Sequence, residues 1–325
     1  MLGYTVILPA RPGSEAETAA ASAAIAAACQ PARANLVVPD APLDLGSFAS
    51  TRAFCEELLA AGAVPRIDAL CLNAGRGGGP EDPRDATVDG HEAIVQTNAA
   101  SHFLMVSLLM PLLRASDAAR IVWQSSGGRF HACEGHVRPK ISDLDGGSAD
   151  HTFNAFHQYA LSKAAMCLLM KGLNERLLAF GVHNVISCAS DPGLSATGVN
   201  LQHDFFKTEF IPQAVKDSGA TTQQMHSAQG HHAADGALPM VLAVASPAAH
   251  RNAWFTTDGV GAGSVEEAAH IADPATSAGQ GGVGLGQDPL LEDAWPRDVR
   301  ESVWEQMVAW SGAQVEEGLS AVAKV

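Results

Sequence analysis

The stretch Ile67-Asp-Ala-Leu-Cys-Leu72 is a short, mainly apolar run that stops at Asn73-Ala-Gly75 and a glycine-rich loop. Such a run is typical of a β-strand buried on both faces of a sheet. The same order recurs at Arg120–Gln124, which runs into Ser125-Ser126-Gly127-Gly128. Strands that end in polar loops and alternate with helical segments predict a parallel sheet covered on both faces. Ligands of such sheets bind outside the carboxyl ends of the strands, where these polar loops fall.

The rest of the chain extends this alternation. The expected fold class is therefore α/β, with a Rossmann-like, doubly wound parallel sheet. We expect one domain over residues 1–325, with a variable substrate-side region around 198–295 and a C-terminal helix over 296–312. Gly281–Gly286 is interpreted as a flexible linker, because it follows no predicted strand. Further strands are expected at Tyr4–Leu8, Asn35–Val38 and His183–Cys188, and helices at Glu15–Cys29, Ser47–Gly62, Val88–Leu113 (bent or broken near Pro111) and Phe156–Phe180.

Composition and charge exclude several classes of protein. Of the 325 residues, 47% are hydrophobic and 17% are charged, as in globular proteins. The net charge of −15 disfavours binding to nucleic acid. The longest apolar run, Phe103–Leu113, has 11 residues, whereas a membrane span needs about 20. The cysteines and histidines lack metal-site spacings, so no metal is predicted. Scattered cysteines and the absence of a visible secretory signal favour a reducing compartment, and we expect a cytoplasmic protein.

A tyrosine and a lysine stand four residues apart in Tyr159-Ala-Leu-Ser-Lys163, within a predicted helix. Residues at this spacing share one face of a helix, so the phenol and the ammonium are expected to be neighbours. A positive charge at about 4 Å is worth about 4 kcal/mol at an effective dielectric constant of about 20, which would lower the pKa of a tyrosine by about three units. Such a tyrosine could exchange a proton with a substrate hydroxyl or carbonyl. The alternatives are an ordinary helix-surface contact for this pair and an ordinary turn for Ser125-Ser126.

Five motifs in a fixed order resemble those of the short-chain dehydrogenase/reductases, over roughly residues 4–200. The long gap between Ser126 and Tyr159 is similar to that of the branch containing retinol dehydrogenases and protochlorophyllide reductases, as is the segment Ala99–Leu113. The resemblance implies hydride transfer between a nicotinamide dinucleotide and a carbonyl or alcohol group. The motifs are Leu72-Asn73-Ala74-Gly75, Thr97-Asn98, Arg120–Ser126, Tyr159-x-x-x-Lys163 and Asp191-Pro-Gly-x-x-x-Thr197.

The resemblance also implies roles for individual residues of an active site. Tyr159 would be the general acid/base, and Lys163 would lower its pKa and hold the nicotinamide ribose. Ser126, in preference to Ser125, would bind the substrate oxygen. Asn98 would position a water molecule in a proton relay.

The same resemblance assigns the dinucleotide to a set of loop residues. Arg11 stands where NADP-preferring members keep an arginine, and a guanidinium suits a phosphate, so NADP is the expected cofactor and NAD the alternative. The other interpretation of Arg11 is a solvated loop cation. Asp44 corresponds to an aspartate that contacts the adenine. The residues expected to bind the cofactor are Arg11, Asp44, Asn73, Ala74, Gly75, Tyr159, Lys163, Pro192, Gly193 and Thr197.

One part of the family pattern is missing. The family opens with a strand and a Gly-x-x-x-Gly-x-Gly turn into a helix, whereas only Gly3 and Gly13 precede Gly46 here. The fold is therefore expected to lack its first strand and Gly-rich turn, which would weaken pyrophosphate binding. The strand at Tyr4–Leu8 must then pair with the one at Ile67–Leu72, leave a gap or expose an edge. The sequence is either a truncated form of a longer reductase or a product that binds dinucleotide poorly. The rival function is an inactive relic that acts as a binding or scaffold protein.

The expected partner is a small apolar carbonyl or alcohol substrate. The family's dimers often pack the helices that correspond to Val88–Leu113 and Phe156–Phe180, so a homodimer is a further hypothesis. An apolar substrate is inferred by fold-level analogy, because aromatic residues lie in the variable region that usually shapes the pocket. These residues are Phe205, Phe206, Phe210, Trp254 and Phe255.

Overall fold

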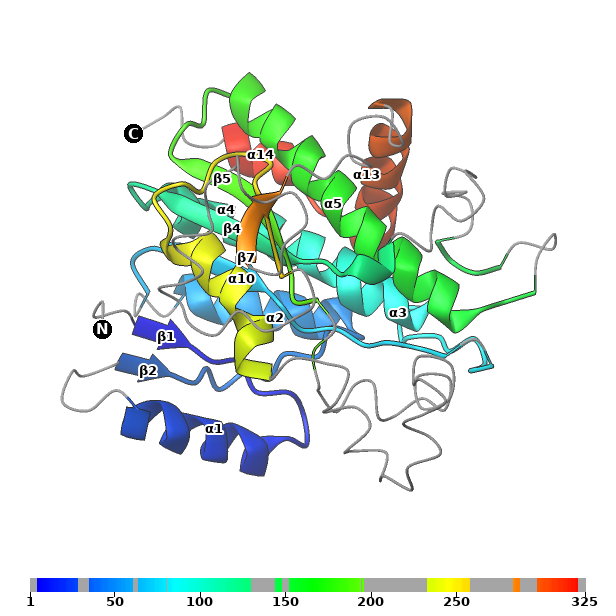
Figure 1. The fold of residues 1–325 in the computed structure, drawn as a ribbon, viewed down its shortest axis with the longest axis horizontal. Coiled ribbons are helices and arrows are strands. Elements are labelled where there is room, and N and C mark those ends of the chain that lie inside the picture. Colours follow the sequence, from blue (N-terminus) through cyan, green and yellow to red (C-terminus); the bar gives the residue numbers. More distant parts are fainter. Residues whose placement is uncertain are drawn as a thin grey trace.

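The computed structural model describes ten stretches of the chain, which form the elements labelled in Figure 1. The described residues are 5–28, 35–60, 64–79, 81–129, 144–147, 152–193, 195, 233–257, 283–286 and 297–320. The strands are β1 (Thr5–Ile7), β2 (Asn35–Val37), β3 (Ala69–Leu72), β4 (Ala119–Gln124), β5 (Val185–Asp191), β6 (Trp254–Thr257) and β7 (Val283–Gly286). The helices are α1 (Glu15–Ala28), α2 (Phe48–Ala60), α3 (Ala93–Val95), η1 (Gln96–Ala100), α4 (Ser101–Arg114), α5 (Ala155–Ala179), α10 (Ala233–Ala245), α13 (Arg297–Ser311) and α14 (Val315–Ser320).

A five-stranded sheet forms the centre of the structure. Strands β3, β4, β5 and β6 are neighbours in that order and run parallel, and β7 is an antiparallel edge. Alternate residues of β4 face opposite sides: Ile121 and Trp123 pack with α4 and α5, whereas Val122 packs with α10. Helices therefore cover both faces, which confirms the predicted α/β class. One interpretation is wrong, because Gly281–Gly286, expected to be a linker, supplies β7 by pairing with β6.

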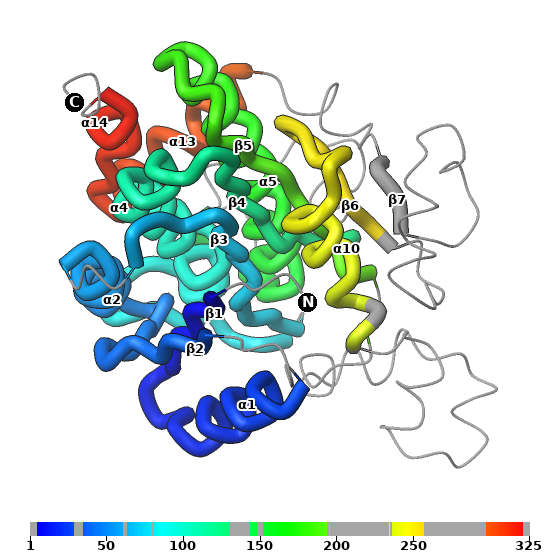
Figure 2. Tube along the Cα trace, turned by 90° about the vertical axis from the view of Figure 1, so that its left-hand side faces the viewer, coloured from blue at the N-terminus to red at the C-terminus, as the bar shows by residue number. Residues whose placement is uncertain are grey.

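A smaller sheet consists of β1 and β2, which pair in parallel. Within the described residues neither strand pairs with β3. The strand expected at Tyr4–Leu8 therefore does not pair with the one at Ile67–Leu72, and the two lie in separate sheets (Figure 2). This unit is poorly shielded from solvent, since Val6 is 37% exposed and α1 has no buried residue. The β1–α1–β2 unit therefore depends on few apolar contacts, in contrast to the large sheet.

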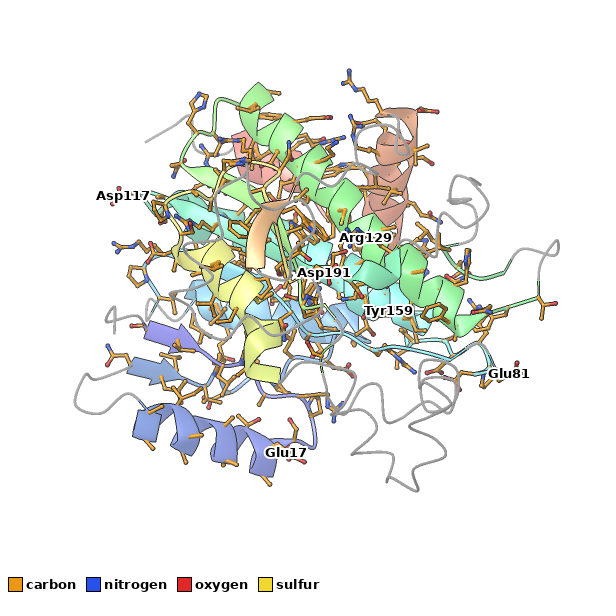
Figure 3. All side chains as sticks on the ribbon, viewed as in Figure 1. Glu17, Glu81, Asp117, Arg129, Tyr159 and Asp191 are labelled. Atoms are coloured by element: carbon orange, nitrogen blue, oxygen red, sulfur yellow. The ribbon has the colours of Figure 1, made fainter. Side chains whose placement is uncertain are left out.

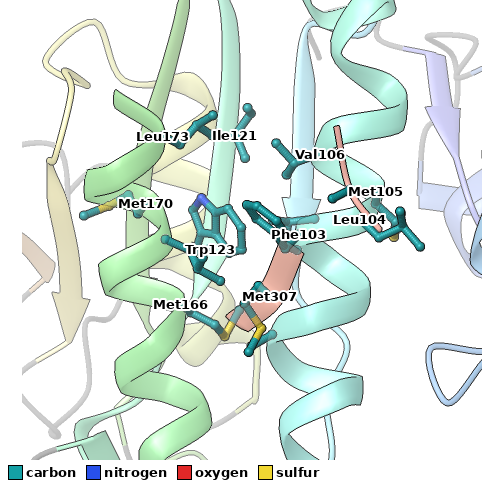
Figure 4. Close-up of a cluster of buried hydrophobic side chains, with 14 of the residues drawn as sticks. Phe103, Leu104, Met105, Val106, Ile121, Trp123, Met166, Met170, Leu173 and Met307 are labelled. Carbon is teal, nitrogen blue, oxygen red and sulfur yellow. The ribbon is translucent and has the colours of Figure 1, made fainter. Parts of the chain in front are cut away.

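The core beside the large sheet is built around two aromatic side chains. Trp123 and Phe103 are fully buried with methionines of α5 and α13 around them (Figure 4). The indole nitrogen of Trp123 donates a hydrogen bond to Ser187 Oγ at 2.8 Å, which satisfies its one polar atom in the core. The ring of Phe103 meets Trp304 of α13 edge to face, with centroids 4.7 Å apart. These contacts tie the sheet, α4 and α13 into one core.

The helix expected over Val88–Leu113 differs from the prediction at both ends. It begins at Ala93, because the Glu92 carboxylate caps it by accepting hydrogen bonds from the N–H groups of Ile94 and Val95. Pro111 does not break it, since α4 continues through the proline to Arg114. The irregularity lies instead at η1, a wider π-helical turn in which the Ser101 N–H bonds to Gln96 O. Such turns occur often at functional sites.

The C-terminal helices cover the surface that the dimer hypothesis needs. Helix α13 packs against α4 and α5, and α14 packs against α4. In the described structure α4 is buried almost throughout, and so is α5 as far as Asn174. Self-association through these two helices is therefore not expected, because the same chain already covers them. The run Ala93–Arg114 is long and apolar enough to span a bilayer, but 89% of its apolar window is buried inside the protein, as in a core helix.

Candidate active site

Three polar side chains meet at the carboxyl edge of the large sheet. Ser126 follows β4, Asp191 is the last residue of β5, and Tyr159 lies early in α5. Figure 3 shows Tyr159, Arg129 and Asp191 close to one another at the centre of the molecule. The position of Tyr159 follows from the start of α5, where the Asn154 side chain caps the helix by accepting the His157 N–H at 2.8 Å.

Tyr159 and Ser126 face each other as predicted from the sequence. A hydrogen bond links their hydroxyl groups, and both residues are partly exposed. The tyrosine ring lies so close to Gly128 that a Cβ at Gly128 would come within 2.9 Å of Tyr159 Cε1. Ser125 points the other way: it is buried, and its hydroxyl donates to Lys163 O at 2.9 Å. The structure therefore separates the two serines into one facing the site and one facing the core.

Lys163 lies below Tyr159 and is buried. Its Nζ is 5.7 Å from the centre of the tyrosine ring and donates to Gln124 O at 2.8 Å. Burial lowers the pKa of Lys163 to about 8, although the Asp191 carboxylate opposes this shift. The two residues are thus neighbours on one helix face, as the spacing predicts.

The expected acidity of Tyr159 is not found in this structure. Burial raises its pKa to about 12, the hydrogen bond from Ser126 lowers it, and the negative charge of Asp191 raises it again. In the chain by itself, burial of the phenol therefore has the largest effect on this pKa. The role of Lys163 in lowering the pKa of Tyr159 stays a prediction.

Asn98 ties the loop after β3 to α5. Its Oδ1 accepts the Arg76 N–H at 2.8 Å, and its Nδ2 donates to Arg76 O and to Ser162 Oγ, each at 2.9 Å. Its main-chain oxygen accepts a hydrogen bond from His102 Nδ1 at 2.9 Å. The amide of Asn98 is therefore committed to protein partners. Its role in placing a relay water stays a prediction.

The residues expected to bind the dinucleotide are only partly brought together. Asn73, Ala74 and Gly75 form an exposed loop after β3. A Cβ at Gly75 would lie 2.8 Å from Asn98 Oδ1 and 3.6 Å from Lys163 Nζ, so this backbone borders both side chains. The Gly193 N–H donates to the Asp191 carboxylate at 2.9 Å, which places the Pro192-Gly193 turn at the same edge.

Three other expected cofactor ligands contribute less. Asp44 is exposed and turns back on its own loop, where its carboxylate accepts the Gly46 N–H at 2.8 Å. Arg11 is exposed in the turn between β1 and α1, next to Ser14. Thr197 lies outside the described residues, as do Phe205, Phe206 and Phe210. Phe255 packs into the core against α10, so it does not support an apolar substrate pocket.

Three residues of this site were not predicted from the sequence. Arg129 pairs with Asp191, Gly128 gives the Tyr159 ring its room, and His102 holds the main chain of Asn98. A signal existed for the ion pair, because Asp191 ends β5 and Arg129 lies in the turn that follows the neighbouring parallel strand β4. No simple signal marks His102, since its role depends on the wider turn at η1.

Substitution of Gly128 tests the fit of the tyrosine ring. We expect Gly128→Ala to fold but to displace Tyr159 or the serine turn, because the new methyl group would lie 2.9 Å from the ring carbon. Any turnover should fall about a hundredfold, as for a misplaced catalytic group. The matched control is Gly127→Ala, whose Cβ would meet the nearest described atom at an ordinary 3.7 Å. Equal losses in both variants would show that ring clearance is not the cause.

Comparison with known proteins identifies the family. A family model for short chain dehydrogenases matches residues 3–136. A short-chain dehydrogenase/reductase of Pyricularia grisea is 30% identical over 201 residues, which cover 56% of this chain and 80% of that protein. The chain therefore belongs to the short-chain dehydrogenase/reductase family.

Two mouse relatives give a finer resemblance. Retinol dehydrogenase 14 is 36% identical over 183 residues, or 54% of this chain and 50% of that protein. Polyprenol dehydrogenase is 36% identical over 160 residues, or 48% of this chain and 44% of that protein. The chain thus matches about half of the length of these relatives. A crystal structure of an uncharacterized protein from Mycobacterium paratuberculosis, 21% identical, gives a TM-score of 0.58 over 96% of this chain and 85% of that one, which shows the fold.

Proposed function

We propose that this protein is an oxidoreductase that transfers a hydride between NADP(H) and the carbonyl or alcohol group of an apolar small molecule, with Tyr159 as general acid/base. The observation that carries the proposal is the hydrogen-bonded pair of Tyr159 and Ser126, partly exposed at the carboxyl edge of a parallel sheet. Lys163 lies directly behind the tyrosine and is buried. This arrangement presents two hydroxyl groups to one substrate oxygen.

Ser126, Tyr159 and Lys163 have different roles in the proton transfer. In reduction, Ser126 Oγ holds the substrate oxygen by a hydrogen bond while Tyr159 Oη donates its proton to that oxygen. In oxidation, Tyr159 takes the proton back from the alcohol. Lys163, when protonated, stabilises the phenolate that Tyr159 becomes after donation. When bound, the nicotinamide would supply the hydride in reduction and accept it in oxidation.

The described residues fit the nicotinamide half of the cofactor. Lys163 Nζ, the exposed Asn73–Gly75 backbone and the Pro192-Gly193 turn border one region, and a side chain at Gly75 would obstruct it. The pyrophosphate half has less support, because the sequence contains no Gly-x-x-x-Gly-x-Gly turn. Among the described strands, β1 pairs only with β2 and β3 only with β4, which is consistent with a strand position left unfilled between β1 and β3. We therefore expect the 325-residue chain to bind NADPH more weakly than a chain that carries this turn.

The substrate class is inferred from the relatives. Retinol and polyprenol, which the names of two relatives give as their substrates, are both apolar alcohols. We therefore choose all-trans-retinal as the first carbonyl probe.

A second candidate function is a binding or scaffold protein built on a reductase fold. The observations that favour it are the separate β1–β2 sheet and the high pKa of Tyr159. Nicotinamide fluorescence and the melting temperature, measured while NADPH is added to millimolar concentration, distinguish the two functions. Binding at ten times the dissociation constant should stabilise the fold by about 1.4 kcal/mol. No change in either signal at millimolar NADPH would favour the scaffold function.

A further inference from the structure

A buried ion pair lies beside the two hydroxyl groups and has no role in the proposed proton transfer. Arg129 Nη1 is 3.0 Å from Asp191 Oδ2, and both side chains are only 6% exposed. The guanidinium also stacks on the ring of Trp254, with its carbon 3.9 Å from the ring centre. Removing water from two charges is costly, and only good geometry with further hydrogen bonds offsets that cost.

The arginine is attached to the loop that carries Ser126. Its Nη1 donates to Ser126 O at 2.8 Å, and its own N–H donates to the same oxygen at 3.1 Å. Asp191, its partner, ends the neighbouring strand β5 and also accepts the Gly193 N–H. The ion pair therefore joins the serine turn after β4 to the turn after β5.

The ion pair of Arg129 and Asp191 also determines the net charge next to Tyr159. Without Arg129, the Asp191 carboxylate would be an uncompensated negative charge beside a tyrosine that must become a phenolate. That charge would disfavour the phenolate, because like charges repel. The other titratable or charged groups that the described residues bring to Tyr159 and Lys163 are Cys167 on α5 and His102 on α4.

We propose that Arg129 is a positioning residue for the proposed reaction: it holds the Ser126 turn onto β5 and neutralises Asp191 beside Tyr159. The proposal rests on the proposed function, because Arg129 would affect the reaction through Tyr159. The geometry has a second feature that a mere surface ion pair lacks, namely a buried aromatic platform that fixes the guanidinium plane. Arg129 thereby acts through Ser126 and Tyr159 and does not itself touch the reacting atoms.

The test measures the ionisation of Tyr159 directly. The chain has two tyrosines, so in a Tyr4→Phe background the ultraviolet absorbance of phenolate reports Tyr159 alone. A stopped-flow pH jump reads this signal before alkaline unfolding. Asp191→Asn should lower the pKa of Tyr159 by about one unit, because the arginine charge remains, and Arg129→Met should raise it by a similar amount. The double variant should return the titration to near that of the parent.

Opposite shifts that cancel in the double variant are the signature of charge. If Arg129 only supports the fold, both single variants lose stability and the tyrosine titration does not move in opposite directions. Asp191→Asn keeps the shape of the side chain and an oxygen for the Gly193 N–H, so it decides the outcome even if Arg129→Met fails to fold. An unchanged or raised pKa in Asp191→Asn overturns the proposal.

Arg176 provides a matched control from the same helix as Tyr159. Its guanidinium also stacks on a tryptophan, Trp304, at 3.8 Å, and pairs with Glu301 at 2.7 Å. It stands 17 residues further along α5 than Tyr159, which is roughly 25 Å at helical rise. Arg176→Met should cost stability but leave the tyrosine titration unchanged.

The absorbance measurement needs no cofactor, so it separates the two hypotheses. Paired shifts without any NADPH binding would refute the proposed function and leave the role of Arg129 in tuning Tyr159 standing. NADPH turnover without paired shifts would support the proposed function and refute the role of Arg129 in tuning Tyr159. With both present, Arg129→Lys should recover much of the turnover lost in Arg129→Met, because it restores the charge though not the planar stack.

Discussion

A Tyr159→Phe protein is expected to lose turnover of retinal and NADPH by about a thousandfold while keeping its affinity for NADPH. The substitution removes only the hydroxyl that would donate the proton. The ring contacts with Gly128 and Phe156 remain, so the fold should be unaffected. Initial rates of NADPH consumption give the turnover, and a binding titration on the same preparation gives the affinity for NADPH.

Ser126→Ala supplies the companion variant. It removes the hydrogen bond that lowers the pKa of Tyr159 and the expected anchor for the substrate oxygen. It should reduce turnover about a hundredfold, as for the loss of one oxyanion donor. Ser125→Ala serves as a control, because its hydroxyl faces Lys163 O inside the core, and it should affect stability more than turnover. If Tyr159→Phe keeps the turnover of the parent, Tyr159 is not the acid/base.

Acid should destabilise this protein strongly through His102. Burial, with a smaller contribution from the charge of Lys163, lowers the pKa of His102 to about 3, and its ring is 2% exposed. The unfolded chain binds a proton at this residue near pH 6.5, whereas the folded chain does so only near pH 3. Stability from the neutral ring is thus complete above the unfolded pKa and is lost as the pH falls toward the folded value. The free energy of unfolding should drop by about 1.4 kcal/mol per pH unit in this window.

Urea unfolding of His102→Asn at several pH values isolates this contribution. The asparagine amide can still donate to Asn98 O, as His102 Nδ1 does, but it does not titrate. The variant should lose its extra dependence on pH between about 3.5 and 6. His250, whose ring is exposed, is the matched control, and His250→Asn should keep the pH dependence of the parent. A His102→Asn protein with the parent's pH dependence would contradict the assignment.

Much of the fold could be predicted because local pattern and final structure agree. The helix expected over Phe156–Phe180 is α5, Ala155–Ala179, and the strand expected at Ile67–Leu72 contains β3. The expected burial of that strand on both faces is wrong, because Cys71 is exposed and only Leu72 of β3 is buried. Motif spacing also placed Tyr159, Lys163 and Ser126 correctly at one edge. Such agreement is expected where a regular hydrophobic pattern extends over many residues and where a parallel sheet brings the ends of its strands to one edge.

The failures have local physical causes. The helix expected to be bent or broken near Pro111 continues to Arg114, because packing of α4 in the core supports it although Pro111 donates no main-chain hydrogen bond. Strand β7 was missed since Gly-rich segments carry no strand pattern and its pairing with β6 is tertiary. The high pKa of Tyr159 could not be predicted from spacing, because it depends on desolvation by residues from several elements. The coverage of α4 by α13 and α14, which argues against the dimer surface, likewise exists only in three dimensions.

Deuterium transfer tests the central claim most directly. NADPH carrying deuterium at the nicotinamide C4 is incubated with the 325-residue chain and all-trans-retinal, and the product is analysed by mass spectrometry. The account predicts an alcohol with deuterium on the former carbonyl carbon and a hydroxyl proton from solvent, formed at least a hundredfold more slowly by Tyr159→Phe. NADPH consumption without deuterium on that carbon, or equal labelling by both proteins, would contradict it.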